Sequence, residues 1–157
     1  MADSIYHQQF TMGLLLVLEE TFEKVQGFFL DKGTSLFETL ETITAEEASV
    51  PVGGKCATLA AQVKHTAFYL EVLQRFVQTG QNEKVDWDDI WRNTSVVTAD
   101  EWATIKTHLR EVYAQTRVMV QSQPDWSQEN AMGGAMAMLA HTAYHLGEIR
   151  QALCTLK

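Results

Sequence analysis

The sequence predicts an all-helical protein, a four-helix bundle, from its periodicity, its composition and its length. Apolar residues recur every three or four positions along four long segments, and glycine and proline are sparse within them. The chain has 157 residues, of which 46% are hydrophobic, and these values fit one compact domain. A chain of this size buries roughly 68–70% of its surface on folding, so its core needs neither a disulfide nor a structural metal. We therefore expect a single domain over residues 1–157.

The first predicted helix runs from about Ser4 to Phe29. Its apolar side chains recur on one face, at Phe10, Leu14, Leu18, Phe22, Val25 and Phe29. Such a stripe indicates a helix that buries one side against the rest of the domain. The following residues, 31–56, contain two capping-box patterns, Ser35 to Glu38 and Thr44 to Glu47, and predict short helical turns.

The remaining three helices are bounded by local signals. The second begins near Thr58 and ends near Gly80, the third begins at a capping box from Thr98 to Glu101, and Pro124 closes it. The fourth runs from about 131 to 155. Residues 81–97 form a connection of 17 residues, long enough to return along the bundle. We therefore expect a crossover that lets the second and third helices run parallel.

The fourth predicted helix is apolar almost all round. Only Glu148 and Arg150 carry charge between Ala131 and Thr155. A helix of this composition either lies centrally in the bundle or is covered by a second subunit. We expect a homodimer, although a central position in a monomer explains the composition equally well.

Charge and cysteine usage limit the partners and the compartment. The formal net charge is −8, and no cluster of Lys and Arg offsets it, so nucleic acid is not an expected partner. The most apolar run near the start, Met12 to Leu18, is far shorter than the ~20 residues that cross a bilayer, so no membrane association is expected. Cys56 and Cys154 form no CxxC pair and follow no secretory signal, which favours free thiols in the cytoplasm.

Two of the five histidines are close neighbours on any helix. His141 and His145 lie four residues apart, which puts both imidazoles on one face with Cβ atoms about 6 Å apart, a spacing that suits two ligands of one metal ion. Gly134 and Met138 precede them in the same row, so another helix can approach closely. His65 lies opposite the polar arc of the second helix and is expected to point into the protein.

These three histidines predict a metal site. Each inward imidazole without a partner costs roughly 1–3 kcal/mol, and one ion satisfies all three. The alternative is that each is a core histidine with its own hydrogen bond. His7 and His108 fall outside this pattern and are expected at the surface.

The residues around the histidines resemble those of a known family. Residues 139–149 (Leu-Ala-His-Thr-Ala-Tyr-His-Leu-Gly-Glu-Ile) and 58–65 (Thr-Leu-Ala-Ala-Gln-Val-Lys-His) are similar to motifs of the DinB/YfiT-like superfamily of metal-binding four-helix bundles. This resemblance implies that His65, His141 and His145 hold a divalent ion, zinc or nickel. Glu148 stands where that family commonly has Gln. It is expected either to accept a hydrogen bond from a ligating histidine or to serve as a fourth ligand.

Three neutral imidazoles leave an ion with its full charge and an open position, as in catalytic rather than structural zinc sites. The resemblance implies a transferase that uses a low-molecular-weight thiol and attacks a small electrophile. Metal-dependent hydrolysis is the neighbouring possibility, and a non-enzymatic dimeric bundle with a structural metal, or with none, is the competing class. The sequence identifies no catalytic residue. The Glu-x-x-His signature of di-iron bundles is absent from the sequence.

Overall fold

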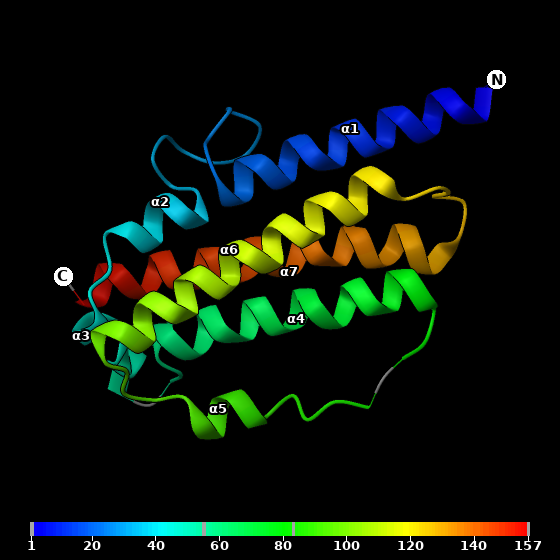
Figure 1. Cartoon of the computed structure of the whole chain (residues 1–157). Helices are drawn as coiled ribbons and strands as arrows, with labels where there is room; N and C mark the ends of the chain where they lie inside the picture. Colours follow the sequence, from blue (N-terminus) through cyan, green and yellow to red (C-terminus); the bar gives the residue numbers. More distant parts are fainter. Residues whose placement is uncertain (1, 55, 83, 157) are drawn as a thin grey trace.

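The computed structural model describes residues 2–54, 56–82 and 84–156, and over these ranges the protein is all-helical, as the sequence predicts. Four long helices lie alongside one another (Figure 1): α1 (Ala2–Phe22), α4 (Leu59–Thr79), α6 (Ala99–Ser122) and α7 (Glu129–Leu156). The connections hold short elements: α2 (Leu36–Glu41), α3 (Ala45–Ala48), the 3₁₀ turn η1 (Val52–Gly54) and α5 (Asp89–Asn93). None of the described helices has the length and apolar character required to cross a membrane.

Helix α4 is the central element. It packs most extensively against α7 and next against α6. The connection that carries α5 returns along the outside, so α4 and α6 run in the same direction, while α1 and α7 run in the opposite one (Figure 1). Although the sequence suggested a central or covered fourth helix, α7 leaves Met132, Met136 and Tyr144 exposed in the chain as described.

The end of α1 differs from the predicted one. The helix stops at Phe22, so Val25 and Phe29 do not continue its apolar face. The reason is Glu20, whose side chain is fully buried and accepts hydrogen bonds from four backbone N–H groups of the following loop. These four hydrogen bonds hold the loop folded back over the end of the helix. They therefore end α1 at Phe22, although the apolar residues continue at helical spacing beyond it.

The other predicted helix boundaries are confirmed within a few residues. Thr58 caps α4 by accepting from the Ala61 N–H, and Gly80 ends that helix with φ 69°, a left-handed conformation that glycine adopts without strain. Thr98 and Glu101 form the expected capping box of α6. Because these signals act within one helical turn, the sequence alone locates them.

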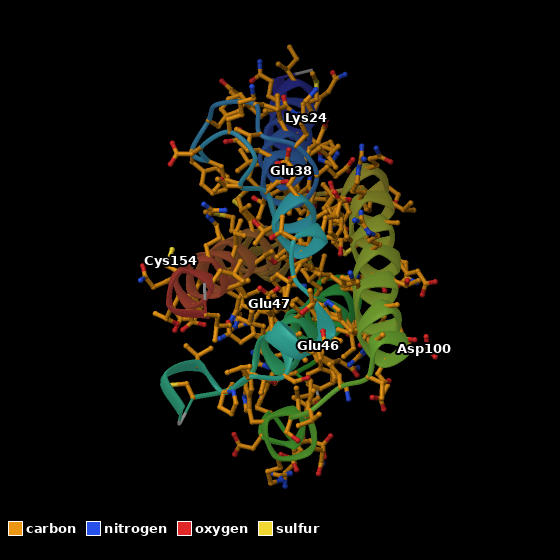
Figure 2. All side chains as sticks on the ribbon, turned by 90° about the vertical axis from the view of Figure 1, so that its left-hand side faces the viewer. Lys24, Glu38, Glu46, Glu47, Asp100 and Cys154 are labelled. Carbon is orange, nitrogen blue, oxygen red and sulfur yellow. The ribbon has the colours of Figure 1, made fainter. Side chains whose placement is uncertain are left out.

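The core lies between the four long helices. Buried Gln74 of α4 donates to the Val112 carbonyl at 3.1 Å and to the Thr116 hydroxyl at 2.9 Å, which ties α4 to α6. Charged side chains such as Lys24 and Asp100 point outward in Figure 2. A Cβ at Gly134 would lie 2.6 Å from a methyl group of Val77, so α7 approaches α4 as closely as a glycine allows.

Candidate metal centre

Helices α4 and α7 bring the three predicted histidines together. His65 projects from α4, and His141 and His145 project from successive turns of α7. Ring centroids are 5.1 Å apart for His65 and His141, 5.0 Å for His65 and His145, and 4.5 Å for His141 and His145. One nitrogen from each ring lies within 4.8 Å of the other two. Zinc binds histidine nitrogen at about 2.0–2.1 Å, so small ring rotations bring this group to ligand spacing.

Each of these histidines has a buried nitrogen without a hydrogen-bond partner in the described part of the chain. These atoms are Nδ1 of His65, Nε2 of His141 and Nδ1 of His145. Leaving such a group unpaired costs about 1–3 kcal/mol, and the helices place three of them together. The alternative interpretation, in which each is a core histidine with its own hydrogen bond, does not agree with these unpaired nitrogens. The donor set fits a divalent ion that prefers imidazole nitrogen.

Burial keeps the three imidazoles neutral at pH 7. Burial, with a smaller contribution from the neighbouring histidines, lowers the pKa of His65 to about 4 and that of His141 to about 3. Burial also lowers the pKa of His145, although the Glu148 carboxylate opposes that shift. Neutral imidazole is the form that binds metal, so the site needs little deprotonation to accept an ion.

Glu148 contacts one histidine of the cluster. Its Oε2 lies 2.9 Å from Nδ1 of His145, off the line of a well-aligned N–H hydrogen bond, and its Oε1 accepts from the Tyr144 hydroxyl at 2.6 Å. The carboxylate is not part of the group of nitrogens that converge within 4.8 Å. The hydrogen bond to Glu148 raises the pKa of Tyr144. Glu148 therefore lies at the edge of the cluster, held by Tyr144.

Aromatic side chains that the sequence reasoning did not assign to the site cover the histidines. Tyr69 stacks on His141 with ring centroids 3.5 Å apart and an interplanar angle of 15°. Trp91 of α5 lies 4.5 Å from His65, and Trp87 lies 5.4 Å from Tyr69. The available signal was the pair of tryptophans four residues apart in an otherwise polar connection. Tyr69 and Trp91 lie against the histidine rings and so restrict their rotamers.

The remaining histidines lie away from the cluster. His108 is exposed, as predicted, with Nε2 3.1 Å from a Glu71 carboxylate oxygen. His7 is half-buried rather than fully exposed, because its ring packs 6.3 Å from that of Trp126. Both cysteines are free and exposed.

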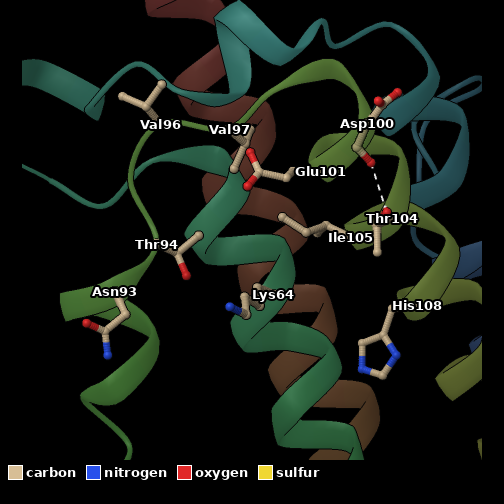
Figure 3. Close-up of a pocket in the computed structure, with 10 residues that line it drawn as sticks. All are labelled: Lys64, Asn93, Thr94, Val96, Val97, Asp100, Glu101, Thr104, Ile105 and His108. Atoms are coloured by element: carbon tan, nitrogen blue, oxygen red, sulfur yellow. Dashed lines mark hydrogen bonds between the residues drawn. The ribbon is translucent and has the colours of Figure 1, made fainter.

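A separate hollow of about 440 Å³ lies between α4, α6 and the segment before α6 (Figure 3). Lys64, Thr94 and His108 are among its lining residues, and the three clustered histidines are not. The Thr94 hydroxyl is buried there without a hydrogen-bond partner in the described chain. Its lining combines a lysine with two acidic side chains and does not favour one class of ligand.

No protein-family model, curated protein or solved structure matches this chain. The functional interpretation therefore depends on the geometry of the histidine cluster and on the residues around it.

Proposed function

We propose that this chain is a DinB/YfiT-like four-helix bundle whose His65, His141 and His145 bind one divalent ion, zinc or nickel. The observation that carries the proposal is that one ring nitrogen from each of the three histidines lies within 4.8 Å of the other two. One divalent ion can accept a lone pair from a nitrogen of each of the three imidazoles, and this binding stabilises the group. The close packing of α4 on α7 holds the ligands in place before the ion binds.

We further propose that the site serves a thiol-dependent transferase reaction. With three neutral ligands, a bound ion keeps its charge and an open position, and it supplies a Lewis acid that stabilises an anionic nucleophile near neutral pH. Trp87, Trp91 and Tyr69 place aromatic rings on one side of the cluster. This aromatic covering favours an organic nucleophile such as a small thiol over water, and therefore transfer over hydrolysis.

In this proposal Glu148 is a positioning residue. It contacts Nδ1 of His145, and the Tyr144 hydroxyl fixes the carboxylate from its other side. A carboxylate beside a ligating histidine sets the orientation of the ring and raises its basicity. In this arrangement Nδ1 of His145 faces Glu148, and Nε2 is the nitrogen that would bind the ion.

Metal content tests the proposal directly. We expect about one divalent ion per chain in the purified protein by elemental analysis, and its loss in His145→Ala. His108→Ala is the matched control, because this exposed histidine lies outside the cluster. Unchanged metal in His145→Ala, with a normal circular dichroism spectrum, would show that the three histidines do not form the site.

The reaction class is tested by conjugation of a small thiol to an electrophile, measured before and after treatment with a chelator. Conjugation that stops on chelation and returns with added zinc or nickel supports the transferase. Ester hydrolysis with the same metal dependence supports the hydrolase instead. Full metal content with neither activity supports a structural ion in a non-enzymatic bundle.

We also propose a homodimer through α7. Met132 and Met136 of that helix are 37% and 55% exposed, and Met12 of α1 is 62% exposed. These methionines lie on α7 and on α1, which packs against it, and they present apolar surface that a second copy can cover. Sedimentation velocity is expected to show a dimer that Met136→Glu dissociates, with a monomer at all concentrations as the opposing result.

A further inference from the structure

Two of the three clustered histidines are buried beneath a ring of the connection between α4 and α6. His65 and His145 are 7% and 5% exposed, although an ion must reach both to bind. The ring centroid of Trp91 is 4.5 Å from that of His65 on α4 and 6.5 Å from that of His145 on α7. A ring this close to side chains of two neighbouring helices lies across the seam between them. The connection therefore covers one side of the cluster.

This covering connection packs on the bundle through apolar side chains. Ile90 is buried, and the ring of Trp87 lies 5.7 Å from that of Phe68 and 5.4 Å from that of Tyr69. Trp91 supplies the third apolar contact, against the histidines. Apolar packing is non-directional, so contacts of this kind can break and form again without a change of hydrogen-bond partners.

The polar side chains of the connection bond within it. Arg92 donates to Asp86, which also accepts from the Asp88 N–H, and Asn93 donates to Asp89. These bonds do not depend on the bundle. They keep the short helix α5 and the residues before it together as one unit when its apolar face leaves α4.

The ends of the connection are fixed, but part of it is separated from the bundle by a hollow. Gly80 begins the connection with φ 69°, and at the other end the Val97 N–H donates to Ser49 Oγ at 2.9 Å. The hollow of about 440 Å³ lies between Asn93 and Thr94 on one side and α4 and α6 on the other (Figure 3). Fixed ends, local hydrogen bonds and incomplete packing are typical of a segment that opens without unfolding the domain.

We propose that residues 84–94 form a lid over the metal centre. The lid opens when the side chains of Ile90 and Trp91 leave the bundle, which exposes His65 and His145 to solvent, and it closes when Trp91 returns to the two rings. Passage of the ion and of a small-molecule substrate through this opening rests on the proposed function. The opening itself needs no metal, so it can be tested separately.

The accessibility of the histidines tests the lid in metal-free protein. Diethyl pyrocarbonate modifies accessible imidazoles, and mass spectrometry identifies the modified residues. We expect Ile90→Ala to speed modification of His65 and His145 about tenfold, because loss of a buried apolar contact favours the open lid. Half-buried His7 and exposed His108 are internal controls and are expected to react at unchanged rates, since the opening is local.

Val96→Ala is the matched control variant, because Val96 belongs to the same connection and is 79% exposed. It is expected to leave every rate unchanged. Trp91→Ala is the second test variant, since it removes the covering ring itself, and it is expected to expose His65 and His145 as Ile90→Ala does. Unchanged modification of these two histidines in both variants would overturn the lid. An equal acceleration at His7 would also overturn it, because the whole domain would then be opening.

Zinc kinetics connect the lid to the metal centre. Because entry and exit both pass through the open state, Ile90→Ala is expected to raise the rate constants of zinc uptake and release about tenfold each, with the Kd within about twofold of its original value, by stopped-flow with a fluorescent chelator. Faster release alone, with weaker affinity, would show that the connection supports the ligands and does not gate them. Absence of zinc binding, with His65 and His145 still exposed by Ile90→Ala, would reject the metal centre and retain the lid.

Discussion

The molecule contains two buried polar groups of opposite character, the Glu20 carboxylate and the histidine cluster. Glu20 is fully buried and accepts four hydrogen bonds, from the backbone N–H groups of Gln26, Phe28, Phe29 and Leu30, at 2.7–3.3 Å. The histidine cluster instead contains three buried nitrogens with no partner in the described chain. A polar group whose hydrogen bonds are all made within the chain stabilises the fold. A cluster whose members lack partners within the chain is a place where an external ligand can bind.

The pKa shifts reflect the same contrast. Burial alone would raise the pKa of Glu20, but the N–H groups of Phe29, Leu30, Phe28 and Gln26 outweigh it and hold that pKa below its ordinary value. No comparable set of donors or acceptors compensates burial at His65 and His141. The carboxylate is therefore held in its charged form and the imidazoles in their neutral form.

The strongest test of this comparison is Glu20→Gln. An amide has one acceptor oxygen, so its NH₂ group faces backbone N–H donors and leaves them unpaired. We expect the Tm to fall by about 10 °C by calorimetry, with metal content unchanged. The exposed residue Glu111, changed to Gln, is the control and is expected to leave the Tm nearly constant. A stable Glu20→Gln protein would mean that the loop after α1 does not depend on this carboxylate.

Acid titration separates the two groups further. In chelated protein the folded pKa values of His65 and His141 lie below the ordinary 6.5, so the unfolded chain binds more protons below that pH. The free energy of unfolding should therefore be constant above about pH 7 and should fall as the pH drops from 6.5 towards 4. The hydrogen bonds to the Glu20 carboxylate hold its pKa below the ordinary 4.5. The contribution of Glu20 to the free energy of unfolding is therefore lost only as the pH falls below 4.5.

Denaturant unfolding at a series of pH values measures both changes. The double variant His7→Gln/His108→Gln is expected to keep the slope between pH 6.5 and 4, since neither residue belongs to the cluster. His65→Gln is expected to reduce the slope. An unchanged slope in His65→Gln would contradict the assignment of this pH dependence to the cluster.

A smaller effect is expected from Glu148→Gln. Removing a carboxylate that orients a ligating histidine costs about 10–100-fold in metal affinity, so zinc competition with a fluorescent chelator should show a loss in that range. Glu71→Gln is the matched control, because Glu71 contacts exposed His108 outside the cluster. A loss beyond about 1,000-fold would instead indicate that Glu148 is a fourth ligand.

The smallest effects concern the neighbouring glycines Gly133 and Gly134, of which only Gly134 faces α4. Gly134→Ala places a methyl group 2.6 Å from Val77, and this overpacking costs about 1–3 kcal/mol, partly offset by a gain in helix propensity. We expect a net loss of about 1 kcal/mol by denaturant unfolding. Gly133→Ala meets open space and should gain about 0.5–1 kcal/mol. Equal effects at the two positions would contradict the close approach.

Several parts of the site were predictable because their signals are local or periodic. The spacing of His141 and His145 places them on one face of any helix, and the polar arc of the second helix indicates that His65 points inward. The small residue at Gly134 correctly indicated a close neighbour. The roles of Trp87 and Trp91 were not predictable, because their contacts depend on how the connection before α6 packs against α4 and α7.

The sequence by itself determined the helical class, the caps at Thr58, Gly80 and Thr98, and the side of each helix that carries the histidines, because these depend on interactions within one or two helical turns. Only the tertiary structure decided where α1 ends, which nitrogens lack partners and which aromatic rings lie against the histidines. Those properties depend on residues far apart in the chain, such as His65 and Trp91, whose proximity arises from packing and has no local pattern.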